Sequence, residues 1–263
     1  MRRITLAIFA TLAAFGQSAN PVRVAEYPSA LVREEQTVVV DGVSETWRLQ
    51  WAAKPKPACK PSEDSLTCPC EGFAYGEAGD LFLVRLRNGH QIDRLRLTRF
   101  FTEWSGAAVV QRWPTLDRDL KVADRRDFPA RVGKRPTVQV MHFADYDHDG
   151  RATEFYLQTE TVPCGKSHGV IIGLSKNNPR LHVFGTVSNP NKPLYMQKRE
   201  WEAVVNAQGP VDVLDWACGD HNLDTETRVR LYWTPKGIDG ISREYTCPPT
   251  PKRLIRQKPL SVD

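Results

Sequence analysis

The fold class is decided by residues 81–97, which read LFLVRLRNGHQIDRLRL. Two β-prone runs, residues 81–87 and 90–97, lie on either side of Asn88-Gly89. A two-residue hairpin turn needs positive φ angles at both central positions, and Asn and Gly adopt these most readily. In the first run, side-chain alternation places three apolar residues on one face and two arginines on the other (Phe82, Val84, Leu86; Arg85, Arg87). The stretch therefore predicts an antiparallel β-hairpin.

The same pattern recurs along the chain. Residues 36–51 contain two β-prone runs around Asp41-Gly42. Residues 169–187 and 227–247 each contain two more, around turn signals at 176–179 and 235–240. Short strands separated by turn signals predict an all-β fold, either a sandwich or a propeller-like arrangement of short hairpins.

Residues 195–206 are the exception to this pattern. Apolar side chains are spaced among Lys, Arg and Glu, and Gly209 follows (Tyr195, Trp201, Val204, Val205). This segment predicts one short amphipathic helix.

Length and composition fit a folded domain. The chain has 263 residues, of which 41% are hydrophobic and 25% charged, so it has more apolar material than disordered proteins contain. We expect a single β-rich domain over residues 17–247, with an irregular Pro- and Cys-rich loop at residues 52–71. Residues 248–263 are basic and Pro-rich, which predicts a mobile tail.

The N-terminus has the features of a secretory signal peptide. Arg2 and Arg3 precede a mostly apolar run, and the small residues Ala14 and Gly16 follow. We expect cleavage after residue 16, or after residue 19, and a secreted or periplasmic mature chain without a transmembrane segment. Loss of the two arginines lowers the formal net charge from +5 to +3, and the charges at residues 118–127 alternate in sign. Both features argue against nucleic-acid binding.

The chain contains an even number of cysteines, as expected for disulfides in an oxidising compartment (Cys59, Cys68, Cys70, Cys164, Cys218, Cys247). Cys59 is close enough in sequence to form a small loop with Cys68 or Cys70. Cys164 and Cys218 each follow a predicted strand, and they could join distant segments. A zinc site is the alternative, but only Cys68 and Cys70 approach the spacing of a ligand pair.

The most informative motif is the acidic segment at residues 145–154, which reads DYDHDGRATE. Ca²⁺ takes six to eight oxygen ligands, and carboxylates at alternate positions of a curled loop can converge on it. Gly150 permits the sharp turn that such a loop needs. Because β-prone runs flank the segment, and because Tyr156 stands where an EF-hand has its bidentate Glu, an EF-hand is excluded.

This strand–loop–strand setting resembles the FG-GAP (VCBS-type) repeat, best known from the β-propellers of integrin alpha subunits. The resemblance covers about 25 residues, within 137–160, and occurs once. It implies Asp145, Asp147 and Asp149 as side-chain ligands of a structural Ca²⁺ and Arg151 as a backbone-carbonyl ligand. The family places its next carboxylate where this chain has Thr153, so Glu154 is a further candidate ligand one residue later. The alternatives are an acidic turn without metal and another ion such as Mg²⁺ or Mn²⁺.

No recognised catalytic motif occurs among the six histidines or around any serine. If Cys164 and Cys218 were bridged, His168, Asp220 and His221 would lie close together and could form an acid–base group. The alternative is a polar turn beside a disulfide. His148 occupies a non-ligating position of the acidic loop and is expected to face solvent.

The chain also has seven tryptophans, which raises the option of sugar binding through exposed rings. Trp104 and Trp113 fall in a less regular stretch and are the candidates for a sugar-binding surface. Core packing is the alternative for both, and it is the expectation for the tryptophans in predicted strands and the helix (Trp47, Trp51, Trp201, Trp233).

These observations predict an exported, calcium-binding, β-rich protein that acts as a non-enzymatic binding or structural module. Its partner would be an unidentified protein or carbohydrate. A secreted hydrolase that uses His168, Asp220 and His221, and a carbohydrate-binding module, are the competing hypotheses.

Overall fold

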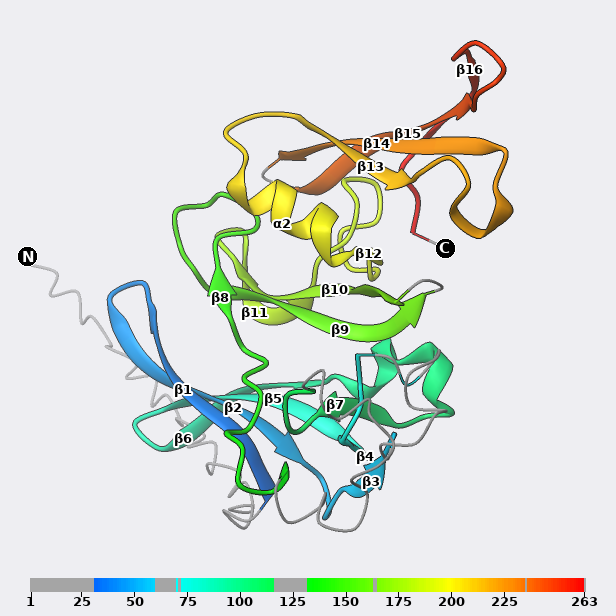
Figure 1. Ribbon diagram of the computed structural model, residues 1–263. Helices are drawn as coiled ribbons and strands as arrows, with labels where there is room; N and C mark the ends of the chain where they lie inside the picture. The colour runs from blue at the N-terminus through cyan, green and yellow to red at the C-terminus, as the bar shows by residue number, and fades with distance from the viewer. Residues whose placement is uncertain are drawn as a thin grey trace, which may run out of the picture.

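The computed structural model describes residues 31–59, 70, 72–115, 132–162, 165–234 and 236–262. Antiparallel strands dominate, with a short α-helix among them, which confirms the all-β prediction (Figure 1). The predicted signal peptide, the charged residues 118–127, Cys68 and Cys164 lie outside the described residues. No helix in the described ranges is long and apolar enough to cross a membrane.

The first sheet confirms both Gly-containing hairpins. It is built from strands β1 (Val32–Val40), β2 (Val43–Trp51), β5 (Leu81–Arg87) and β6 (His90–Arg96), in the order β1-β2-β5-β6. Asp41 and Gly42 have φ angles of 50° and 79°, and Asn88 and Gly89 have 51° and 77°. Positive φ at both turn positions is what a two-residue hairpin requires.

The second sheet is central in the molecule. Its strands follow the order β11 (Asn178–Val183), β10 (Lys166–Ser175), β9 (Glu154–Val162) and β8 (Phe143–Ala144), and β12 (Met196–Gln197) also pairs with β10. The predicted turn between the two long runs lies between β10 and β11.

The third sheet contains a strand where a tail was expected. Its order is β13 (Val211–Trp216), β14 (Thr225–Thr234), β15 (Gly237–Thr246) and β16 (Leu254–Pro259). The prediction of a mobile tail over residues 248–263 is therefore wrong for β16, which pairs with β15. Every residue of β16 is exposed, so the strand has none of the apolar alternation that marks a half-buried strand.

A smaller sheet accompanies the predicted Pro- and Cys-rich loop. It has the order β3 (Lys56–Ala58), β4 (Gly76–Gly79) and β7 (Ala108–Gln111). Short 3-10 turns at Thr98–Phe100 and Thr102–Trp104 precede β7. The described part of the loop predicted at residues 52–71 thus includes one short strand, β3.

The predicted helix is confirmed with a later start. Helix α2 spans Lys198–Asn206, because Met196 and Gln197 pair with β10 before the helix begins. Gln197 is the N-cap residue, and its backbone N–H donates to Glu200 Oε2 at 2.8 Å, as in a capping box.

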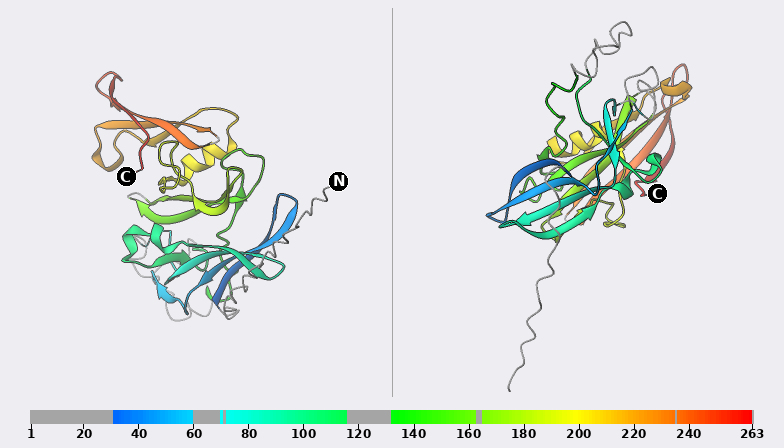
Figure 2. Two further views of the ribbon diagram at one scale, coloured as in Figure 1. Left: turned by 180° about the vertical axis from the view of Figure 1, so that it is seen from behind. Right: turned by 90° about the horizontal axis from the view of Figure 1, so that it is seen from below.

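The sheets are stacked in layers (Figures 1 and 2). The central sheet lies above the first sheet in Figure 1, and α2 packs between the central sheet and the third sheet. Both faces of β10 are therefore buried: Val170 and Ile172 belong to the core shared with the first sheet, and Ile171 belongs to the core shared with α2. A continuous apolar run is typical of a strand that is covered on both sides.

The face of β5 that carries Arg85 is buried together with Leu81 and Leu83, whereas Arg87 at the end of the strand is exposed. Arg85 is 5% exposed, and its Nε donates to the fully buried Glu45 Oε2 at 2.8 Å. Arg85 also donates to the carbonyl oxygen of Pro179 in β11 at 2.8 Å. The charged side chain thus joins the first sheet to the central sheet.

Two disulfides lie within the described residues. Cys59 is bonded to Cys70, which confirms the predicted small loop. Cys218 is bonded to Cys247, so the pairing of Cys218 with Cys164 is wrong. The bond instead joins the segment after β13 to the end of β15.

Candidate metal centre

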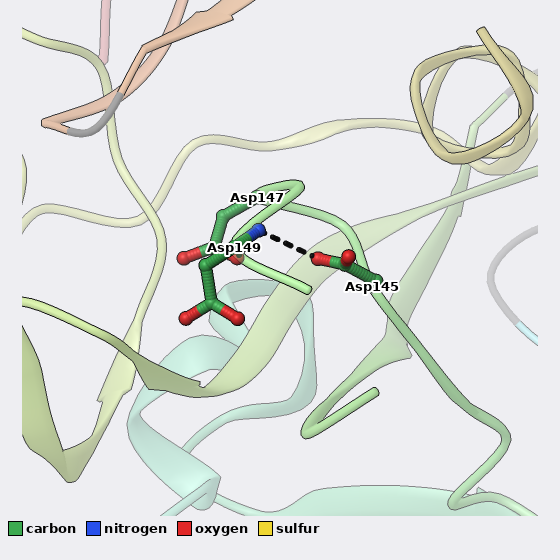
Figure 3. A group of neighbouring side chains, drawn as sticks. All are labelled: Asp145, Asp147 and Asp149. Carbon is green, nitrogen blue, oxygen red and sulfur yellow. Dashed lines mark hydrogen bonds between the residues drawn. The ribbon is translucent and has the colours of Figure 1, made fainter. Parts of the chain in front are cut away.

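The acidic loop connects β8 to β9. Phe143 and Ala144 of β8 pair with Phe155 and Glu154 of β9, so the loop is the connection of an antiparallel pair. The strand expected upstream is reduced to two residues, and the strand expected downstream extends to Val162. Among the described residues, one carboxylate oxygen each of Asp145, Asp147 and Asp149 lies within 4.8 Å of the others (Figure 3).

Backbone N–H groups hold the first two aspartates in place. Asp145 Oδ1 accepts from the N–H of Asp149 at 3.0 Å (Figure 3). Its Oδ2 accepts from the N–H of Gly150 at 3.0 Å. Asp147 Oδ1 also accepts from the N–H of Asp149, at 3.2 Å. Gly150 has a φ of 91°, so the loop reverses where the sequence has its glycine.

Asp149 accepts more hydrogen bonds than Asp145 or Asp147 does. Its Oδ2 accepts from Arg151 Nη2 at 2.6 Å and from the N–H of Lys176 at 2.7 Å. Its Oδ1 accepts from the N–H of Arg151 at 3.0 Å. The guanidinium and these hydrogen bonds hold the pKa of Asp149 below its ordinary value, although burial opposes this.

Glu154 lies outside the group of three. It is fully buried, its Oε2 accepts from the N–H of Tyr146 at 2.9 Å, and its Oε1 accepts from Thr153 Oγ1 at 2.5 Å. Burial, with the negative charge of Asp147, raises the pKa of Glu154 to about 8. Glu154 therefore stabilises the loop through hydrogen bonds on its buried side.

Burial also acts on Asp147. Together with the charge of Asp149, it raises the pKa of Asp147 to about 7. Burial and the negative charge of Asp149 thus destabilise the ionised form of Asp147, and the positive charge nearby does not offset them.

His148 does not face solvent, contrary to expectation. Its ring stacks on Trp233 of β14 with centroids 3.8 Å apart, and its Nε2 lies 2.9 Å from the carbonyl oxygen of Val204 in α2. The neighbouring Tyr146 is buried, with its ring edge-on to Trp201 at 6.2 Å. These contacts attach the loop to the core around α2.

The donor set fits a hard divalent cation. A carboxylate offers about four lone-pair positions; the hydrogen bonds above use two at Asp145 and one at Asp147. Oxygens therefore remain for a cation at both residues, whereas Asp149 is shared with the Arg151 guanidinium. The resemblance assigns Arg151 a backbone ligand role, and the structure adds its side chain as a cation within the loop.

The two hydrolase candidates with described side chains, His168 and Asp220, each have a different polar partner. Asp220 Oδ2 accepts from Lys166 Nζ at 2.7 Å, whereas His168 Nδ1 is hydrogen-bonded to Glu160. The backbone of His221 lies in a 3-10 turn, Asp220–Asn222, and its side chain is outside the described part of the structure.

His168 lines a cavity whose wall also contains acidic side chains. This cavity has a volume of about 220 Å³, and its lining includes His168, Glu200 and Asp215. Glu160 faces His168 across the β9–β10 pair, and Asp215 comes from β13. Neither Glu160 nor Asp215 was predicted as a site residue from the sequence. The cross-strand register of β9 and β10 would have indicated Glu160.

Neither proposed sugar-binding tryptophan stands free on the surface. Trp104 is partly buried, its Nε1 donates to the carbonyl oxygen of Thr159 at 3.1 Å, and its ring is edge-on to Phe73. Trp113 is partly buried and packs edge-on against Tyr75. Both contacts fit the core-packing alternative.

Comparison of the chain with known protein families, curated proteins and solved structures finds no match.

Proposed function

We propose that this chain is an exported calcium-binding protein that acts as a non-enzymatic binding or structural module. The observation that carries the proposal is the convergence of Asp145, Asp147 and Asp149 within 4.8 Å in a loop between two strands. Carboxylate oxygens at this density are the ligands that Ca²⁺ prefers, and Mg²⁺ demands a stricter octahedral arrangement.

The proposed compartment has two supports. The N-terminal sequence has the order of charged, apolar and small residues found in secretory leaders. The disulfides Cys59–Cys70 and Cys218–Cys247 are typical of proteins that fold in an oxidising space.

A structural role for calcium follows from the neighbours of the loop. Through Lys176, Val204 and Trp233, the loop contacts the β10–β11 turn, α2 and β14. A cation that relieves repulsion among the aspartates would stabilise all of these contacts together.

The test is calcium titration of the purified, chelator-treated mature chain by calorimetry, with thermal melts in Ca²⁺ and in EDTA. We expect saturable binding and a higher melting temperature in Ca²⁺, and loss of both in Asp147→Ala. Asp212→Ala removes the same side chain from an exposed ion pair with Arg230 and serves as the control. Absence of heat, together with identical melts in Ca²⁺ and EDTA, would refute the proposal.

A hydrolase is the second candidate, favoured by the Glu160–His168 hydrogen bond. A carboxylate on Nδ1 orients an imidazole and leaves Nε2 to act as a base. His168 also lines the 220 Å³ cavity, so that base would have access to a small substrate.

Turnover of p-nitrophenyl esters and glycosides tests this candidate. Activity that is lost in His168→Gln and kept in His90→Gln, at an exposed position of β6, would support it. Equal, background turnover by the wild type and both variants would remove it.

A further inference from the structure

A second feature adjoins the acidic loop: a cavity of about 380 Å³. Its wall is formed by the β10–β11 turn, the segment that follows β11, and the β14–β15 turn, and Asp147 also lines it. The volume is within the usual range for small-molecule sites. Asp147 is thus shared between the aspartate loop and the cavity.

The wall is rich in short neutral polar side chains. Ser175, Asn178, Asn191 and Thr234 contribute hydroxyl and amide groups. Asp147 and Lys236 contribute one charge of each sign, so the wall carries little net charge. Such a wall matches a neutral ligand with many hydrogen-bonding groups better than it matches an ion.

The partly buried ring of His182, packed on the buried ring of Phe184, gives the cavity an apolar surface. His182 stacks on Phe184 with ring centroids 4.6 Å apart and an interplanar angle of 29°, and both residues line the cavity. Burial lowers the pKa of His182, so its ring is neutral near pH 7. Neutral rings beside hydroxyl and amide groups suit a ligand with an apolar face and a polar edge.

The other described cavities differ in character. The cavity at His168 is lined by several ionisable groups. The largest described cavity, about 510 Å³, is lined by valines and Leu157 together with glutamines, tyrosines and the charged Lys198 and Glu202. Neither of these two cavities includes an aspartate of the loop in its lining.

We propose that the cavity beside Asp147 binds a carbohydrate: a neutral ring molecule whose hydroxyl groups meet Ser175, Asn178 and Asn191, and whose carbon face meets the ring of His182, which Phe184 supports from the core side. This inference rests on the proposed binding function and names its ligand class. Because Asp147 belongs to both sites, cation binding in the loop and sugar binding in the cavity are coupled.

The test is an amide NMR titration of the mature chain with methyl glycosides of glucose, galactose, mannose and N-acetylglucosamine, in Ca²⁺ and in EDTA. At least one glycoside is expected to cause saturable shifts at residues 175–191 and 234–237. Weaker binding in EDTA would show the coupling through Asp147.

Two variants with the same added bulk localise the site. Asn191→Trp fills the cavity from an exposed position and should abolish the shifts, whereas Asn206→Trp at the exposed end of α2 should leave them unchanged. Absence of shifts with all four glycosides, or shifts confined to the other two cavities, would overturn the inference. Calcium calorimetry without sugar tests the proposed function separately: a chain that binds calcium and no glycoside disproves only the carbohydrate site.

Discussion

The guanidinium of Arg151 donates to Asp41 Oδ1 at 3.0 Å and thereby joins the aspartate loop to the β1–β2 turn, 110 residues away in sequence. The same guanidinium binds Asp149, whose carboxylate accepts from the backbone of Lys176. One side chain therefore connects the β1–β2 turn with the acidic loop, and through Asp149 with the β10–β11 turn.

Replacement of Arg151 should lower the stability of the calcium-free protein and raise its affinity for calcium. In Arg151→Met, Asp149 loses its guanidinium partner, so we expect a loss of about 1–3 kcal/mol of unfolding free energy in EDTA. Calcium binding should become tighter, because the oxygens of Asp149 are released to the cation. Chemical denaturation and calcium calorimetry measure the two effects, with Arg256→Met, from an exposed pair with Glu244, as the control. Weaker calcium binding in Arg151→Met would show that the guanidinium does not compete with the cation.

The buried ion pair between Glu45 and Arg85 in the first sheet should contribute strongly to stability. Glu45→Gln removes the nearer carboxylate and leaves Arg85 only the longer contact with Asp93 at 3.7 Å, and removing one partner of a buried pair costs up to about 3–5 kcal/mol. Urea denaturation measures the loss. Glu35→Gln changes a pair in which both side chains are exposed, and it should cost less than about 1 kcal/mol. Equal effects of the two substitutions would contradict this assignment.

Close packing of β9 against β10 should make Gly173 irreplaceable. A Cβ at this position would lie 2.3 Å from the carbonyl oxygen of Thr153 and 2.9 Å from Glu154 Cγ. We expect Gly173→Ala to lower the unfolding free energy by about 1–3 kcal/mol and to weaken calcium binding by shifting the base of the loop. Gly209→Ala, where the new Cβ meets no atom within 4 Å, is the matched control and should melt like the wild type.

Glu200 should make stability depend on pH. Burial, with the charge of Asp215, raises its pKa in the folded protein to about 8, from an ordinary value of 4.5. Between these values the folded state keeps a proton that the unfolded state releases. The unfolding free energy should therefore fall as pH rises from 4.5 to 8, by at most about 1.4 kcal/mol per pH unit from this group.

Glu200→Gln should flatten that profile and make the variant at least as stable as the wild type above pH 8. Part of the slope should persist, because burial also raises the pKa of Asp215, of Glu154 (to about 8) and of Asp147 (to about 7). Glu202→Gln, on the exposed side of the same helix, is the control. Parallel pH profiles for Glu200→Gln and the wild type would argue against this role.

Local turn chemistry made much of the fold predictable. Asp41-Gly42 and Asn88-Gly89 adopt the positive φ angles that their residue types favour, and no distant contact is needed for that. β16 was missed for the opposite reason. Its six residues are all exposed, so its place in the sheet depends on backbone pairing with β15, and no side-chain pattern records it.

The candidate site was predictable in its spacing and less so in its surroundings. Alternate aspartates before Gly150 indicate a curled loop, and the three carboxylates do converge. The contact of His148 with Trp233 depends on the packing of β14 over the loop, about 85 residues later in the chain. The bond between Cys218 and Cys247 was likewise one of many pairings that the sequence left open.

The side chains of β10 alternate between two cores, and this restricts which changes of sequence the strand can accept. Val170 and Ile172 fill one core and Ile171 fills the other. Deletion or insertion of a single residue in β10 would move side chains of each core into the other core, because successive side chains of a strand point to opposite faces. Homologous chains should therefore differ at β10 in the size of individual side chains while keeping its length constant.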